Sequence, residues 1–208
     1  MSAIIGSRIK TIVFMTLMCT LWLVSGPTLP PAFAAEYSSP IYGGPGGKYS
    51  YNLDCGRGAV ITGLMYKSGS WVDAIGVICR KVSASTGRLG EEFTRGPKGG
   101  YGGTPRVSKC PSGAVINRVK AHYGAFVNFF ATTCYVWDSS RKRPGSMYRD
   151  RNGRGVFPRA GSPCGSLDFS CKRTENFTCS SGKTGKALRG RYGGFIDSIR
   201  FVCDGWDQ

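Results

Sequence analysis

Three equally spaced cysteine pairs constrain this chain more than any other feature of its sequence. In each pair the two cysteines lie 24 positions apart, and the residues between them align without gaps; the pairs are Cys55 and Cys79, Cys110 and Cys134, and Cys179 and Cys203. Matched positions hold Gly58, Gly69, Trp71, Val72, Asp73 and Ile75 in the first segment, Gly113, Gly124, Phe126, Val127, Asn128 and Phe130 in the second, and Gly182, Gly193, Phe195, Ile196, Asp197 and Ile199 in the third. Repetition of this length indicates one supersecondary unit used three times, in which no copy can bury its apolar face alone. We therefore predict approximate threefold symmetry around one shared core.

The first 34 residues are typical of a secretory signal. Arg8 and Lys10 precede an apolar run over 11–24, and Ala32-Phe33-Ala34 offers a cleavage site of the small-x-small type. An uncleaved membrane anchor is the alternative, but a run of this length falls short of the roughly 20 residues that a spanning helix needs. We predict a signal peptide at 1–34, a single domain of three repeats at 35–208, and a secreted or periplasmic protein.

The cysteine count indicates disulfide bonds. Of the nine cysteines, Cys19 leaves with the signal, and the remaining even number in an exported chain indicates oxidised pairs. The midpoint between Cys55 and Cys79 falls in the turn at 67–69, so a hairpin folded there places the two sulfurs opposite each other. Repeat symmetry gives the other two pairs by the same argument.

The two cysteines outside the repeats, Cys164 and Cys171, are then expected to pair with each other. Free thiols or a zinc site are the alternatives. No CxxC spacing occurs and His122 is the single histidine, which disfavours zinc. We expect no bound metal.

Strand signals dominate the rest of the chain. Short alternating runs such as 59–66 and 71–79 lie between clusters of Gly, Ser and Pro, and no stretch has a helical period. We predict an all-β domain in which the connections 80–109 and 135–178 supply further strands. Trp137 and Trp206, each three residues after a closing cysteine, are interpreted as core residues that cover the disulfides.

The charge indicates an anionic partner. Two of the 28 Lys and Arg lie in the signal, so 26 remain against 12 Asp and Glu, a net charge of +14. Seven bases lie in 141–159 with Asp150 as the one acid, and this segment is interpreted as a solvated loop. Nucleic acid fits the charge, but an exported chain seldom meets it, so we expect no nucleic acid and favour an anionic polysaccharide, a glycoconjugate or a membrane surface.

Glycine motifs precede the repeats and carry a resemblance to a known family. The sequence GGPGG occupies 43–47 and GGYGG occupies 99–103, whereas the third copy, at 161–165, is degraded to GSPCG. Together with KSGSWVDAIGVIC (67–79) and RYGGFIDSIRFVC (191–203), these motifs resemble the jacalin-related lectins and their disulfide-bearing relatives, the vitelline membrane outer layer proteins. The resemblance covers roughly 41–208. It implies a β-prism I fold, with three four-stranded antiparallel Greek-key sheets around one apolar core.

The resemblance also implies where sugar binds. In the lectins a glycine-rich loop and a G-x-x-x-D turn hold the sugar, and the Asp carboxylate accepts hydrogen bonds from two hydroxyls. Mapped here, one implied site comprises Gly43, Gly44, Gly46, Gly47, Gly193, Gly194, Phe195 and Asp197, and the other comprises Gly99, Gly100, Gly102, Gly103, Gly69, Ser70, Trp71 and Asp73. The third corner carries Asn128 instead of Asp and is not expected to bind. In the alternative interpretation, Asp73 and Asp197 only cap their own turns.

The sequence favours binding over catalysis. A glycosidase needs two carboxylates within about 10 Å, and Asp73 and Asp197 are expected at separate corners. His122 precedes Gly124 without a nucleophile motif and is interpreted as an exposed turn residue. We predict a carbohydrate-binding, lectin-like protein, not an enzyme, without a cofactor. The alternative is a non-catalytic basic protein that coats an anionic surface or binds a protein partner.

Overall fold

Alternation of apolar and polar residues builds the strands of this chain. In strand β8 (Ala114–Tyr123), Val119 and Ala121 are fully buried while Arg118 and Lys120, which alternate with them, are exposed, because successive side chains of a strand point to opposite faces. The computed structural model describes residues 37–162 and 173–207. The predicted signal peptide and the predicted Cys164–Cys171 pair lie outside these residues. Nowhere within them is there a helix of the length and apolarity needed to cross a bilayer.

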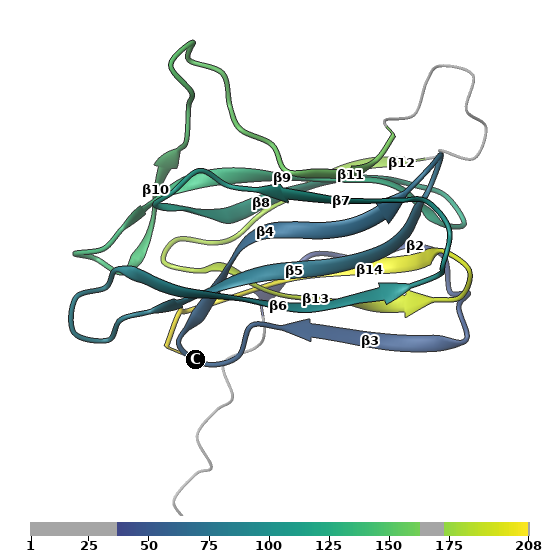
Figure 1. Cartoon of the computed structure of the whole chain (residues 1–208), viewed down its shortest axis with the longest axis horizontal. Coiled ribbons are helices and arrows are strands. Elements are labelled where there is room, and N and C mark those ends of the chain that lie inside the picture. The colour runs from purple at the N-terminus through teal and green to yellow at the C-terminus, as the bar shows by residue number, and fades with distance from the viewer. Residues whose placement is uncertain (1–36, 163–172, 208) are drawn as a thin grey trace, which may run out of the picture. The chain divides into compact units, whose positions relative to one another are not determined.

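Three long hairpins form the centres of three antiparallel sheets (Figure 1). The hairpins are β4 (Ala59–Ser68) with β5 (Val72–Val82), β8 with β9 (Val127–Asp138), and β13 (Thr184–Tyr192) with β14 (Ile196–Asp204). We call the sheets that contain them sheet B, sheet C and sheet A, respectively. In sheet B, β6 (Leu89–Gly99) pairs with β5 and β7 (Thr104–Lys109) with β4. In sheet C, β10 (Arg143–Met147) and β11 (Arg159–Gly161) pair with β9, and β12 (Arg173–Thr178) pairs with β8. In sheet A, β1 (Tyr37–Ser38) and β2 (Tyr42–Gly43) pair with β14, and β3 (Tyr49–Asp54) pairs with β13.

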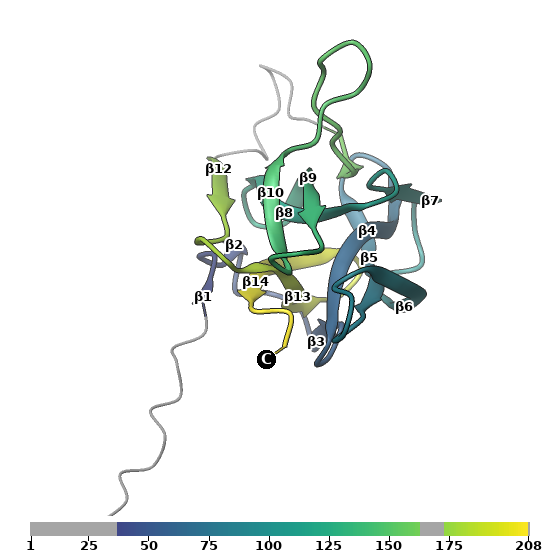
Figure 2. The ribbon, with the colours of Figure 1, turned by 90° about the vertical axis from the view of Figure 1, so that its left-hand side faces the viewer.

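The three sheets surround one apolar core, as the view along the strands shows (Figure 2). Ile75, Phe130 and Ile199 occupy the same position in the three repeats and are each 0% exposed, so every repeat contributes equivalent side chains to the shared centre. The predicted fold class, an all-β β-prism with a disulfide in each repeat, is confirmed. Sheet A draws its outer strands from the N-terminal segment and its hairpin from the C-terminal one, which closes the threefold arrangement.

The strand count departs from four in two sheets. In sheet A, β1 and β2 pair with successive parts of β14 and together act as one interrupted outer strand. Pro40 lies at the interruption and has no N–H to donate to the ladder. In sheet C, β10 and β11 share β9 in the same way, because the 148–158 segment is inserted between them.

Each repeat disulfide joins one sheet to the next. Cys55 follows β3 of sheet A and bonds Cys79 in β5 of sheet B. The same step connects sheet B to sheet C through Cys110–Cys134, and sheet C to sheet A through Cys179–Cys203. The predicted pairing within the repeats is therefore observed, and its structural effect is to fasten the edges of the prism.

The tryptophans do not cover the disulfides. Trp137 is 6% exposed and packs with Val60, Val82 and Val115 in a small second cluster, with Trp206 at its edge. The indole N–H of Trp137 donates to the carbonyl oxygen of Gly87, 2.7 Å away. Four of the disulfide cysteines belong to the main core instead: Cys55, Cys79, Cys179 and Cys203. The expectation failed because the distance of a tryptophan from a cysteine along the sequence does not determine which side chains it contacts in the fold.

The basic 141–159 segment is only partly a loop. It includes β10 and ends at the first residue of β11, and the part between the two strands projects away from the sheets (Figure 1). Its tip is a tight turn in which Asp150 accepts hydrogen bonds from the backbone N–H groups of Asn152 and Arg154. The one acid of the segment thus shapes the turn that presents the arginines.

Candidate functional site

A glycine-rich loop lies directly on the Asp197 carboxylate at one corner of the prism. Gly43, at a φ of +108°, pairs with Ser198 at the end of β2, and the N–H of Gly44 donates to the Asp197 carbonyl oxygen at 3.0 Å. A Cβ on Gly46 would lie 2.6 Å from Asp197 Oδ1, and one on Gly47 would lie 2.8 Å from Oδ2. Only glycine permits this approach of backbone to carboxylate.

The Asp73 corner repeats the arrangement. The N–H of Gly100 donates to the Asp73 carbonyl oxygen at 2.8 Å, and a Cβ on Gly102 would lie 2.6 Å from Asp73 Oδ1. A side chain on Gly103 would likewise collide with Oδ2. The structure thus brings the 43–47 loop to Asp197 and the 99–103 loop to Asp73, the juxtaposition that the resemblance implied.

The two carboxylates differ in their hydrogen bonding. Asp73 Oδ2 accepts the N–H of Gly69 at 3.1 Å, so the turn-capping role is present at that corner. Asp197 is also 5% exposed, but its Oδ2 is buried and makes no hydrogen bond within the described part of the chain. Burial raises the pKa of Asp197, while the N–H of Gly193 and the charge of Arg191 act in the opposite direction. An acceptor of this kind gains a hydrogen bond from a ligand hydroxyl once the Gly47 backbone that covers it moves aside.

Arg191 fixes the first loop and was not predicted as a site residue. Its Nε donates to the carbonyl oxygens of Gly46 and Gly47 at 2.9 and 3.2 Å, and its Nη2 donates to Gly47 at 2.7 Å. The sequence did contain a signal, because the position twelve residues after the first cysteine of each repeat is basic or imidazole-bearing: Lys67, His122 and Arg191.

The aromatic residues of the three turns form one cluster rather than separate walls. Trp71 and Phe195 lie 4.7 Å apart between ring centroids, Phe126 and Phe195 5.6 Å, and Trp71 and Phe126 6.0 Å. The glycine loops also pack on neighbouring turns, Gly44 against Ala125 and Gly100 against Gly194. Both candidate corners therefore lie at the same end of the prism, around a shared aromatic centre.

The third corner keeps the framework without the carboxylate. Asn128 is 1% exposed, and Gly161, at a φ of +80°, lies against its carbonyl oxygen. The remainder of the degraded motif, 163–165, lies outside the described residues.

His122 is predicted from the sequence to be an exposed turn residue, and the structure shows that this is wrong. It belongs to β8, packs edge-on to Phe129 at 5.0 Å, and both of its ring nitrogens are buried. Burial and the charge of Lys120 lower its pKa. The prediction failed because β8 extends to Tyr123, directly before Gly124, the glycine that all three repeats hold at this position.

No group of three or more His, Cys, Asp or Glu that could hold a metal ion occurs in 37–162 or 173–207. Neither family models nor curated proteins match the sequence.

Lectins are among the solved structures that resemble this chain. The chain resembles the Malaysian banana lectin (19% identity, TM-score 0.53, covering 82% of this chain and 99% of that one) and a mannose-binding jacalin-related lectin from Ananas comosus (17%, 0.53, 82% and 98%). It also resembles artocarpin in complex with mannopentose (13%, 0.56, 81% and 97%). At these identities the likeness establishes the fold, which is the β-prism of jacalin-related lectins.

Proposed function

We propose that this chain is a secreted, glycan-binding protein of the lectin type, with one sugar site at the Asp197 corner and a second at the Asp73 corner. The observation that carries the proposal is the close contact of a glycine loop with a fixed carboxylate at both corners. The lectins that share the fold include one crystallised with mannotriose. The net charge and the signal-like leader support an extracellular, anionic target.

Each corner offers what a sugar ring needs. The carboxylate supplies acceptors for hydroxyl groups, and the backbone approaches closely because the loop has no side chains. At the Asp197 corner, Arg191 holds the loop in place before the ligand arrives, which lowers the entropy cost of binding. No step of this function breaks a bond, so we propose a binding protein rather than an enzyme.

We further propose that the target glycan is acidic. A polar groove of about 460 Å³ adjoins the Asp73 turn; Gly69 and Ser68 line one part of it, and Arg106 and Arg159 line another. Two guanidinium groups beside a sugar site favour a carboxylated or sulfated neighbour in the same glycan.

Asparagine at both carboxylate positions is expected to weaken specific binding strongly. The Asp73→Asn/Asp197→Asn variant keeps side-chain shape, and the fold already accommodates Asn128 at the third corner. Each corner loses a charged acceptor, which weakens binding by about 2 kcal/mol, or about thirtyfold. A glycan array at low and physiological salt, with the parent and the variant in parallel, measures the loss. Equal array profiles for the two proteins would overturn the site assignment.

A basic coating protein is the second candidate function, and the projecting 148–158 turn favours it. The backbone segment that carries Arg149, Arg151 and Arg154 stands away from the sheets (Figure 1). Attachment through these arginines would weaken as salt rises. Arg149→Glu/Arg151→Glu/Arg154→Glu would then abolish attachment, while the two-site Asn variant would bind normally. The lectin proposal predicts the opposite pair of results.

A further inference from the structure

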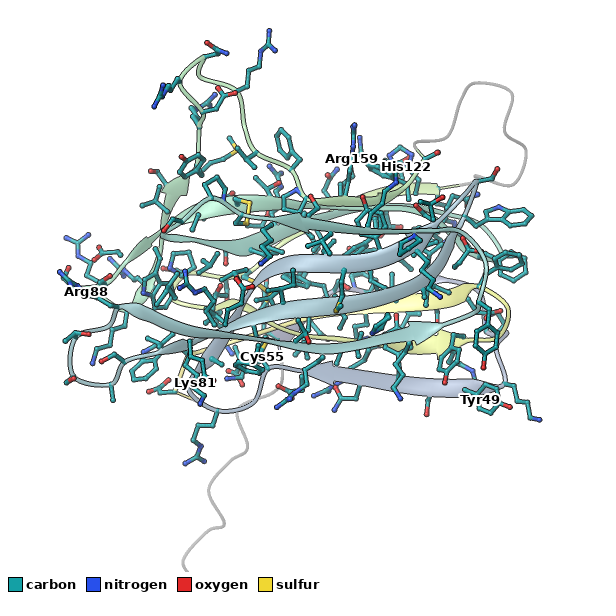
Figure 3. The ribbon with its side chains drawn as sticks, viewed as in Figure 1. Tyr49, Cys55, Lys81, Arg88, His122 and Arg159 are labelled. Atoms are coloured by element: carbon teal, nitrogen blue, oxygen red, sulfur yellow. A yellow bond between two sulfur atoms is a disulfide. The ribbon has the colours of Figure 1, made fainter. Side chains whose placement is uncertain are left out.

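The outer face of sheet C contains a cavity that the corner sites do not use. Its volume is about 360 Å³, and its lining residues come from β8, β9, β12, β11 and the segment that leads into β11. They are Arg118, Val119, Lys120, His122, Phe129, Ala131, Thr133, Phe157, Arg159 and Asn176. Figure 3 shows His122 and Arg159 on this side of the molecule.

Strand register explains the hollow and its charge. Arg159 of β11, Ala131 of β9, Lys120 of β8 and Asn176 of β12 are directly paired across the sheet and so form one row on its outer face. Ala131 has the smallest side chain of the row, so it forms a floor between the two cationic side chains.

The next row of the sheet contains the aromatic ring of Phe129 and the two ring nitrogens of His122. His122 pairs with Phe129, and the two rings meet edge-on. Neither ring nitrogen of His122 has a hydrogen-bond partner among the described residues, although both are buried. Buried polar groups are normally satisfied, so this imidazole, which lines the cavity, is sensitive to any charge or donor that enters beside it.

All charge in the lining is positive. Arg118 and Lys120 on β8 and Arg159 on β11 line the cavity with His122, and no Asp or Glu is among the lining residues. The apolar surfaces of Phe129 and Phe157 lie beside these cations. Cations around a ring-sized apolar hollow select an anionic ligand with a flat or puckered ring.

The cavity is connected to the corner region through one residue. Arg159 lines both this cavity and the groove beside the Asp73 turn. A glycan bound at that corner could therefore extend over Arg159 to the face of sheet C.

From these contacts we infer that the sheet C cavity binds a carboxylated sugar residue, with its carboxylate between Lys120 and Arg159 and its ring over Ala131. The ligand class rests on the proposed glycan-binding function, but the cavity binds without help from Asp73 or Asp197. The site gives the protein a means of distinguishing acidic from neutral glycans.

His122, as the single histidine, allows a direct test by NMR of its imidazole signals. D-glucuronic acid is expected to shift these signals saturably and to raise the His122 pKa, because a nearby anion favours the imidazolium form. Binding is accordingly expected to be tighter at about pH 5.5 than at about pH 7.5. D-glucose is expected to leave the signals unchanged. Equal shifts with acetate would overturn the inference by showing a site for any small anion.

Single substitutions in the cavity lining test the proposed position of the ligand. Ala131→Leu fills the floor and is expected to abolish the response, and Lys120→Gln, at an exposed position, is expected to weaken binding about fivefold. Arg88→Gln, which removes the same charge far from the cavity (Figure 3), serves as the control and should bind normally. A full response in Ala131→Leu would contradict the inference.

The Asp73→Asn/Asp197→Asn variant separates this inference from the proposed function. It is expected to retain the complete His122 response to glucuronic acid. Loss of the response in that variant would contradict an independent cavity site, whereas a retained response with an unchanged glycan array would contradict only the corner sites.

Discussion

Replacing Cys55 and Cys79 together by alanine is expected to lower the free energy of unfolding by about 3 kcal/mol. The disulfide closes a loop of 24 positions and joins the end of sheet A to the middle of sheet B. Its removal therefore increases the entropy of the unfolded chain and unfastens one edge of the prism. For a domain of this size the midpoint of thermal unfolding should fall by about 6 to 12 °C.

The repeat provides the matched comparison. Cys179 and Cys203 enclose a loop of the same length, so the Cys179→Ala/Cys203→Ala variant should lose a similar amount. Urea unfolding of both variants and the parent measures the differences. A loss below about 1 kcal/mol in either variant would contradict the structural role given to these bonds.

Alanine at Gly46 is expected to remove one of two binding sites. The added Cβ would lie 2.6 Å from Asp197 Oδ1, so the loop must move off the carboxylate and the backbone can no longer approach a sugar. Affinity at that corner should fall at least about tenfold. Gly102→Ala should act in the same way at Asp73, where the corresponding distance is also 2.6 Å.

Stoichiometry shows whether the corners are independent. Isothermal titration with the best glycan from the array should give two sites per chain for the parent, one for either single variant, and none for the double variant. Gly90→Ala is the control, because the nearest atom to its added Cβ is the carbonyl oxygen of Lys81 at 3.7 Å. One site per chain in the parent would contradict the account of two equivalent corners.

Most of the fold could be predicted from the internal repeat. Equal cysteine spacing predicted the three hairpins and their disulfides, because a hairpin turned at its midpoint must bring the two cysteines together. It could not predict that Trp137 packs against Gly87 and the second cluster, since that contact joins segments of different repeats. Nor could it predict the interrupted outer strands, which depend on Pro40 and on the inserted 148–158 turn.

The motifs of the candidate site could be predicted from the sequence, but the residues that hold those motifs in place could not. The glycine loops and the Asp turns are local patterns that the sequence displays directly, whereas the pairing of each loop with its turn came from the family resemblance. Arg191 reaches back to a loop 144 positions earlier, and Trp71, Phe126 and Phe195 come together only because the threefold fold brings their turns to one end. Contacts of this kind require the register of all three sheets.

Backbone amide NMR of the oxidised domain during titration with the best glycan from the array, at physiological salt, tests the central claim most directly. The account predicts saturable shifts at Gly44, Gly46 and Gly47 and at Gly100 and Gly102, the loops that contact Asp197 and Asp73. Shifts confined to the projecting 148–158 turn that disappear as salt is raised would contradict it, and would identify a basic protein held to anionic surfaces by charge.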